Sequence, residues 1–241
     1  MLLNSFHDRA GNNAVRVSRS QASHFAKQVA GDFNPIHDTD ARRFCVPGDL
    51  LFGLVLNHYG LASSMQFRFD SMLAADTELI LPPDETSTLT LRDHSGQSYL
   101  TVERSGPTIR DPSVIEDFIR EYVAFSGYNF PHYLQPLMER EGVMFNPQRP
   151  FVIYDYMAFE LDHADIEQPN VSLSDSSLTV DGRRGDANLA FAIHDRGDRI
   201  GIGSKRLIIS GLQPYDADRM DRVIEAFHER RAAHLGAASS G

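Results

Sequence analysis

The residues best suited to chemistry lie in one short segment, in which Asp32 and His37 flank an Asn-Pro dipeptide. A carboxylate and an imidazole can each take up or release a proton, and together they could hold one water molecule between them. Pro35 fixes one backbone dihedral and keeps Asn34 out of the helical region, which predicts a shaped loop. The Asn34 side chain carries donors and acceptors that could orient either partner. The simpler interpretation of Asp32 is a turn residue that bonds nearby amides.

An apolar helix is expected after this loop, and it would bring a glycine close to the pair. Residues 48–65 are apolar on nearly all sides, which predicts a buried helix. Gly53 is expected at or near the start of this helix, where a backbone N–H can stabilise negative charge developing on an oxygen atom. Together with Asp32 and His37, such an N–H would form a site for adding water across an activated double bond.

The elements around the loop determine where it sits. Alternation over residues 14–19 predicts a strand, and apolar spacing over residues 21–30 predicts a short helix that has Ser20 as its N-cap and ends at Gly31. Short strands are expected after the buried helix, at residues 66–69, 77–81, 86–92 and 99–104. The first half is therefore predicted to consist of a helix, a loop, a buried helix and an antiparallel meander.

The second half repeats the order of helix and then meander. A linker rich in Gly and Pro is expected at residues 106–112, followed by a helical stripe that begins near Val114 and a second helix at residues 133–141. Strands are expected at residues 151–161, 171–180, 187–194 and 200–209, and an amphipathic helix at residues 217–235. The two halves share no visible sequence identity, so the prediction is one of repeated architecture.

Composition and charge exclude several classes of protein. With 41% hydrophobic and 23% charged residues, the chain is expected to fold over most of its length. A net charge of −10 and scattered arginines argue against a nucleic-acid surface, although local cations can still bind a small anion. No segment reaches about eighteen uninterrupted apolar residues, and no secretion signal is visible, so membrane spanning and secretion are both disfavoured.

The cysteine and histidine pattern bears on redox compartment and on metal binding. Cys45 is the only cysteine in the sequence, so neither an intrachain disulfide nor a Cys-based zinc site can form. A cytoplasmic location is the simplest inference. The histidines outside the loop show no His-x-x-x-His spacing, and we expect neither a metal nor a cofactor.

One stretch of the sequence resembles a known family. The segment Gly31-Asp-Phe-Asn-Pro-Ile-His37, followed by Asp40 and an apolar helix, is similar to the motif of MaoC-like, (R)-specific enoyl-CoA hydratases (hydratase 2) and dehydratases. The resemblance covers residues 20–65. These enzymes have the hotdog fold, in which an antiparallel sheet wraps a long central helix. The resemblance implies an α+β double hotdog, with an N-terminal unit at residues 1–108 and a degenerate unit plus a C-terminal helix at residues 109–241.

The resemblance also implies an activity and a role for each residue. The reaction would be hydration of a trans-2-enoyl thioester, or dehydration of a (3R)-hydroxyacyl thioester, carried by CoA or by an acyl-carrier protein. On that analogy Asp32 activates water, and His37 exchanges the proton at the alpha carbon. Asn34 positions the pair, and the Gly53 N–H polarises the thioester carbonyl. Two alternatives remain: an acyl-thioester hydrolase, in which Asp32 directs water at the carbonyl, and a non-catalytic acyl-thioester binding or regulatory module. A homodimer is also left open.

Overall fold

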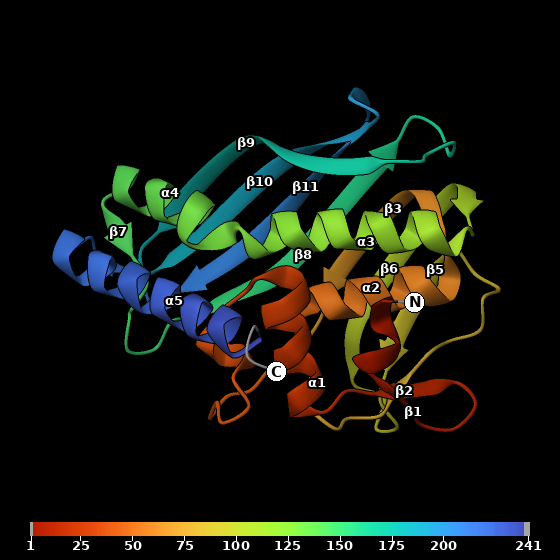
Figure 1. Ribbon diagram of the computed structural model, residues 1–241, viewed down its shortest axis with the longest axis horizontal. Coiled ribbons are helices and arrows are strands. Elements are labelled where there is room, and N and C mark those ends of the chain that lie inside the picture. Colours follow the sequence, from red (N-terminus) through yellow and green to blue (C-terminus); the bar gives the residue numbers. More distant parts are fainter. Residues whose placement is uncertain (1, 239–241) are drawn as a thin grey trace.

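The computed structural model describes residues 2–238, and a ten-stranded sheet forms its centre (Figure 1). The strands lie in the order β1-β2-β4-β5-β6-β3-β8-β11-β10-β9, and neighbours pair antiparallel. The N-terminal half supplies β1 (Asp8–Arg9), β2 (Ala14–Arg16), β3 (Leu61–Phe69), β4 (Leu79–Ile80), β5 (Thr88–Arg92) and β6 (Ser98–Ile109). The C-terminal half supplies β8 (Val152–Leu161), β9 (Pro169–Asp181), β10 (Arg184–Asp195) and β11 (Asp198–Ser210). A separate small sheet pairs β7 (Val143–Met144) with β12 (Gln213–Pro214).

Two central helices, one from each half, lie side by side across one face of this sheet (Figure 1). They are α2 (Gly48–Tyr59) and α3 (Pro112–Gly127). The remaining helical segments are η1 (Leu2–Ser5), α1 (Arg19–Phe25), η2 (Ala26–Ala30), η3 (Pro35–His37), η4 (Asn129–Tyr133), α4 (Leu134–Arg140) and α5 (Ala217–Ala238). A central helix wrapped by antiparallel strands, present twice, is the α+β double hotdog. None of the helices described here combines the length and the apolar content needed to cross a bilayer.

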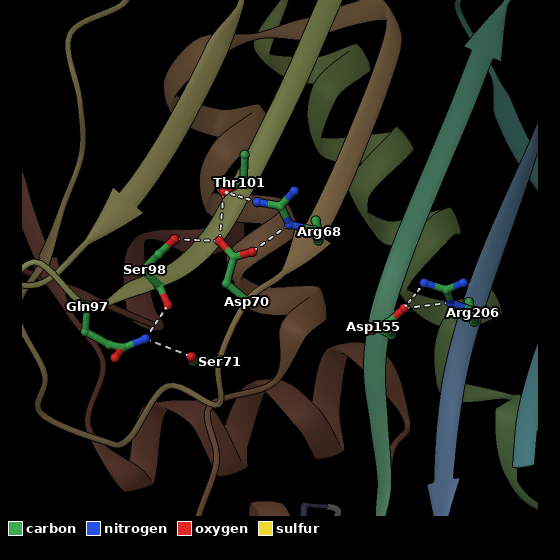
Figure 2. A network of polar contacts seen from close by, with 8 residues as sticks. All are labelled: Arg68, Asp70, Ser71, Gln97, Ser98, Thr101, Asp155 and Arg206. Carbon is green, nitrogen blue, oxygen red and sulfur yellow. Dashed lines mark hydrogen bonds and ion pairs between the residues drawn. The ribbon is translucent and has the colours of Figure 1, made fainter. Parts of the chain in front are cut away.

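The two halves of the sheet meet where β3 pairs with β8. Met65 lies opposite Phe159 and Phe67 lies opposite Met157, and all four side chains are buried. Such directly opposed apolar pairs are the unit by which sheets are stabilised. The ion pair between Arg206 and Asp155 adds a polar link between the neighbouring strands β11 and β8 (Figure 2). The sheet therefore continues through both halves of the chain.

The buried helix ends earlier than the sequence pattern predicts. It was expected to continue to residue 65, whereas α2 ends at Tyr59 and β3 begins at Leu61. Gly60 stands between them with a φ of 89°, a conformation that residues with a Cβ rarely adopt. A Cβ there would also lie 2.9 Å from the carbonyl oxygen of Ile109. Leu61, Ala62 and Met65 are buried because they belong to a strand that packs on the core.

Two other expectations near element ends need correction. Most of the segment expected as a linker is strand, because β6 continues to Ile109 and pairs there with Leu61 of β3. The first helix begins at Arg19, and its N-cap is Ser18 instead of Ser20. Ser18 and Gln21 form a capping box in which each side chain accepts a hydrogen bond from the other's backbone N–H. The other predicted strands and helices are present within a few residues of their expected bounds.

Candidate active site

Asp32 is held by the end of the helix that precedes it. The π-helical turn η2 closes on Gly31, which has a left-handed φ of 65°. The Asp32 N–H then donates to the carbonyl oxygen of Ala26 at 2.8 Å. Glycine suits this position because it has no Cβ to oppose a positive φ. The carboxylate therefore projects from a well-defined helix terminus.

The Asn-Pro turn fixes the Asp32 carboxylate through the main chain. The Asn34 N–H donates to Asp32 Oδ1 at 2.8 Å, while the Asn34 side-chain oxygen accepts from the Ile36 N–H at 3.2 Å. Asn34 is thus the N-cap of η3, with Pro35 as the first residue of that turn. The structure places Asn34 beside the pair, and its backbone makes the contact with Asp32.

His37 is buried, and its ring orientation is set by a backbone carbonyl. Its Nδ1 lies 2.7 Å from the oxygen of Cys45, which can only accept a hydrogen bond, so Nδ1 carries a proton. The other ring nitrogen, Nε2, lies 3.6 Å from Asp32 Oδ2. That separation exceeds a direct hydrogen bond. It leaves Nε2 and Oδ2 free to bond a third atom together.

Both residues line a cavity of about 520 Å³ that lies between the two halves of the chain. This volume is within the usual range of about 300–1,000 Å³ for small-molecule sites. Much of the wall is apolar, including Leu51, Phe69, Leu73, Leu134, Phe145, Val152 and Leu207. Helix α5 adds a stripe of six residues: Arg219, Arg222, Val223, Ala226, Phe227 and Arg230. The site residues are therefore placed at a pocket that has both apolar and cationic parts.

The glycine at the start of the buried helix is Gly48, and Gly53 lies elsewhere. Gly53 is the sixth residue of α2, where the N–H already has an acceptor four residues back, and it packs against Leu3 and Ile119. The expected role of Gly53 is therefore wrong. Gly48 is the first residue of the helix and lines the cavity. Its N–H has no acceptor within the helix and can meet a developing oxyanion.

A polar network anchors the cavity rim where β3 ends (Figure 2). Asp70 accepts hydrogen bonds from Ser98 Oγ at 2.5 Å, Thr101 Oγ1 at 2.7 Å and Arg68 Nε at 2.7 Å. Burial raises the pKa of Asp70, but these donors outweigh it, so the pKa lies below its usual value. Three residues further on, the Leu73 carbonyl accepts the Val46 N–H at 2.9 Å, just ahead of α2. The network thus fixes one side of the cavity mouth.

A second polar cluster in the cavity wall could not be predicted from the sequence. Ser126 Oγ, at the end of α3, donates to Asp49 Oδ2 at 2.5 Å, and Lys205 Nζ of β11 donates to the same Oγ. The Lys205 ammonium also lies 4.1 Å from the centre of the Tyr154 ring. Asp49, Ser126 and Lys205 are all buried, and all line the cavity. They lie far apart in the sequence, and no short motif links them.

Burial shifts the proton affinity of both charged groups in this cluster. It raises the pKa of Asp49, an effect that the Lys205 ammonium and the Ser126 hydrogen bond partly oppose. It lowers the pKa of Lys205, an effect that the Asp49 carboxylate partly opposes. Shifts of this kind in a cavity wall are typical of functional sites.

Helix α5 closes one side of the cavity over the loop of the pair. Phe227 makes edge-on ring contacts with Phe33, at a centroid distance of 5.7 Å, and with Phe130, at 5.8 Å. Phe33 is the residue between Asp32 and Asn34, so the C-terminal helix packs directly on the loop.

Among the described residues no three His, Cys, Asp or Glu side chains are grouped to hold a metal ion.

Comparison with known protein families gives one match that covers most of the chain. A family model described as "Protein of unknown function (DUF3581)" matches residues 1–218. The chain belongs to this DUF3581 family. No curated protein matches the sequence. The match spans the loop, both central helices and the whole ten-stranded sheet, so the cavity of this DUF3581 protein is built largely from the part that the family shares.

Several solved structures are similar to this DUF3581 chain at low sequence identity. One is a conserved protein with a hotdog fold from Alicyclobacillus acidocaldarius, with 9% identity, 89% and 99% coverage of the two chains and a TM-score of 0.48. Another is a putative thioesterase II from Thermobifida fusca, with 11% identity, 86% and 96% coverage and a TM-score of 0.44. A MaoC-like dehydratase has 10% identity, 86% and 99% coverage and a TM-score of 0.42. Likenesses this distant define no activity for the DUF3581 chain.

Proposed function

We propose that this DUF3581 protein hydrates trans-2-enoyl thioesters, or dehydrates (3R)-hydroxyacyl thioesters in the reverse direction. The observation that carries the proposal is the Asp32–His37 pair, whose facing atoms lie 3.6 Å apart in the wall of a largely apolar cavity. Carboxylate and imidazole are the usual general acid and base groups of enzymes. The motif resemblance of the loop to MaoC-like hydratases supports the same reaction.

The hydrogen bonds around the pair support a separate role for each group. Asp32 Oδ1 is occupied by the Asn34 N–H, which leaves Oδ2 to bind a water and take its proton. Hydroxide then adds to the beta carbon of the enoyl group. With Nδ1 bonded to the Cys45 carbonyl, an imidazolium at His37 has its Nε2 proton free for the alpha carbon. Return of the water proton from Asp32 to His37 restores both groups.

The start of α2 would polarise the thioester. During addition, negative charge develops on the carbonyl oxygen, and N–H groups at a helix N-terminus stabilise it. Gly48 occupies that position in the cavity wall. A Cβ at Gly48 would lie 2.9 Å from Tyr154 Cδ1 and 3.0 Å from Phe69 Cε1. Only a glycine brings the helix terminus this close to the aromatic wall.

The rest of the cavity suits an acyl chain and an anionic carrier. The apolar wall would hold the acyl chain, and the three arginines of α5 would bind phosphate groups of CoA or of a carrier-protein arm. These cations line the cavity of a protein whose net charge is −10. Local arginines can bind a phosphate in spite of an unfavourable overall charge.

One assay separates the proposed reaction from its alternatives. The purified protein is mixed with crotonyl-CoA and longer trans-2-enoyl-CoAs while enoyl absorbance and free thiol are followed together. Loss of absorbance with formation of a (3R)-hydroxyacyl thioester is the expected result. Release of thiol that requires Asp32 and leaves no hydroxyacyl product would favour a hydrolase that uses Asp32, and binding without either change would favour a non-catalytic module. Either of these results would overturn the hydratase proposal.

A further inference from the structure

The hydroxyl of Ser126 lies between a carboxylate and an ammonium inside the cavity wall. It donates to Asp49 Oδ2 at 2.5 Å and accepts a hydrogen bond from Lys205 Nζ. The three residues come from α3, α2 and β11, so both halves of the chain build the cluster. None of the three takes part in the proton transfers assigned to Asp32 and His37.

A purely structural role leaves part of this cluster unexplained. Burying a carboxylate and an ammonium is costly, and the cost is offset only when their remaining hydrogen-bonding capacity is satisfied. Asp49 Oδ1 is buried and has no hydrogen-bond partner among the described residues. One oxygen of the carboxylate is therefore available for a ligand or a water, while the other holds the Ser126 proton.

We infer that Ser126 is a nucleophile that accepts the acyl group of a thioester or ester bound in the cavity, and then passes that group to water. A serine hydroxyl is unreactive by itself and needs an adjacent base, which Asp49 supplies. The Lys205 ammonium stabilises the negative charge that develops on Oγ as its proton leaves. The resulting activity is hydrolysis, distinct from the hydration proposed above.

In the first half-reaction the serine oxygen attacks the carbonyl carbon. The Oγ–C bond forms, the hydroxyl proton moves to Asp49 Oδ2, and the carbonyl electrons move to the oxygen atom. The N–H groups of Gly48 and Asp49 start the helix without an acceptor inside it, and they can bond this oxyanion. Collapse of the intermediate breaks the C–S bond, and the leaving thiolate takes the proton from Asp49.

In the second half-reaction water replaces the thiol. Water attacks the acyl-serine carbon and gives its proton to Asp49, whose free Oδ1 can hold that water. Collapse breaks the C–Oγ bond, and Ser126 regains a proton from Asp49. The sum is thioester plus water giving carboxylic acid plus thiol, and the cluster returns to its starting state.

Labelling of the serine tests this inference. The full-length protein is incubated with an alkyl fluorophosphonate, and separately with p-nitrophenyl butyrate, and the modified residue is located by peptide mass spectrometry. We expect both reagents to modify Ser126. Hydrolysis of p-nitrophenyl butyrate should fall at least about 100-fold in Ser126→Ala and in Asp49→Asn. The matched control Ser113→Ala removes an exposed hydroxyl from the same helix and should hydrolyse the ester at the wild-type rate.

The labelling of the wild-type protein tests the inference even if the variants do not fold. Modification at another residue, or no modification of the wild-type protein, overturns it without any variant. Ester hydrolysis that persists in folded Ser126→Ala also overturns it. The readout is a mass increase on Ser126, whereas the hydratase proposal is read from enoyl absorbance, so failure of one does not imply failure of the other.

Discussion

The Nδ1 atom of His37 lies 2.7 Å from the carbonyl oxygen of Cys45, and this contact decides which proton of the ring can move. Because a carbonyl only accepts, the Nδ1 proton stays in the hydrogen bond. Nε2 is left facing Asp32 Oδ2. A backbone atom eight residues along the chain thus holds the ring in the orientation that the proposed proton exchange requires.

Removal of either member of the pair should abolish hydration. We expect Asp32→Asn and His37→Gln each to lower kcat by about 10²–10⁴-fold, the usual contribution of a general acid or base. The measurement is loss of enoyl absorbance, with circular dichroism as the check on folding. Asp40→Asn is the matched control, since Asp40 is an exposed carboxylate on the same loop. Full turnover in either folded pair variant would exclude the proposed mechanism.

The two glycines of α2 should respond differently to a methyl group. Gly48→Ala should lower kcat at least about tenfold, because the new Cβ would press on Tyr154 and Phe69 and move the helix terminus away from the carbonyl. Gly53→Ala should keep kcat within about twofold, since its Cβ would meet the flexible side chain of Leu3 at 3.0 Å and Ile119 at 3.4 Å, both away from the cavity. Equal losses in the two variants would contradict the assignment of the oxyanion position to Gly48.

The arginines of α5 should affect carrier binding more than chemistry. We expect Arg219→Ala and Arg222→Ala each to raise KM for an enoyl-CoA about tenfold, which corresponds to about 1.4 kcal/mol. The KM for the matching N-acetylcysteamine thioester, which lacks phosphate groups, should stay unchanged. Arg231→Ala serves as the control, because Arg231 is exposed and does not line the cavity. A parallel rise with both substrates would argue against phosphate binding by these residues.

The Asp70 network should make stability depend on pH in the acid range. Its folded-state pKa is lowered, so its contribution is fully present above the unfolded-state pKa of about 3.9 and disappears as the pH falls through the folded-state value. At pH 7, Asp70→Asn should lower the free energy of unfolding by about 1–2 kcal/mol through the weakened hydrogen bonds. Urea denaturation from pH 7 to pH 3 should show this difference shrinking. A difference that stays constant would exclude the ionised network as its source.

Cys45 should be unreactive while the protein is folded. Burial raises the pKa of its thiol to about 11, so about one molecule in a thousand carries the thiolate at pH 8. We expect the native protein to react with Ellman's reagent at least about 100-fold more slowly than the urea-unfolded chain. Rapid reaction of the native protein would show that the thiol is more accessible and more ionised than its surroundings imply.

Local signals were sufficient to predict most elements and the loop that carries Asp32 and His37. The Asn-Pro turn and Gly31 impose their conformations through their own chemistry, so Asp32 and His37 could be expected to face one another. The alternation in β8 and the apolar stripe of α3 are likewise properties of short stretches. Information of this kind is available without knowledge of any distant contact.

The parts that the sequence did not predict depend on long-range packing. Leu61, Ala62 and Met65 could be buried in either a helix or a strand, and the positive φ of Gly60 ends the helix before them. The Ser126 cluster joins residues 77 and 79 positions apart, so no spacing reveals it. A lysine within a strand, such as Lys205, is usually solvent-exposed, and its burial follows from the fold alone.

Because β3 pairs with β8 within one chain, the two walls of the cavity can differ in sequence, which is not possible between the identical subunits of a symmetric assembly. In a dimer of identical subunits each substitution occurs at two symmetry-related places, and both must tolerate it. Here both walls belong to a single polypeptide, so every position occurs once. Lys205 could enter one wall while the other wall kept Asp32 and His37, so each half of the chain can be altered without changing the other.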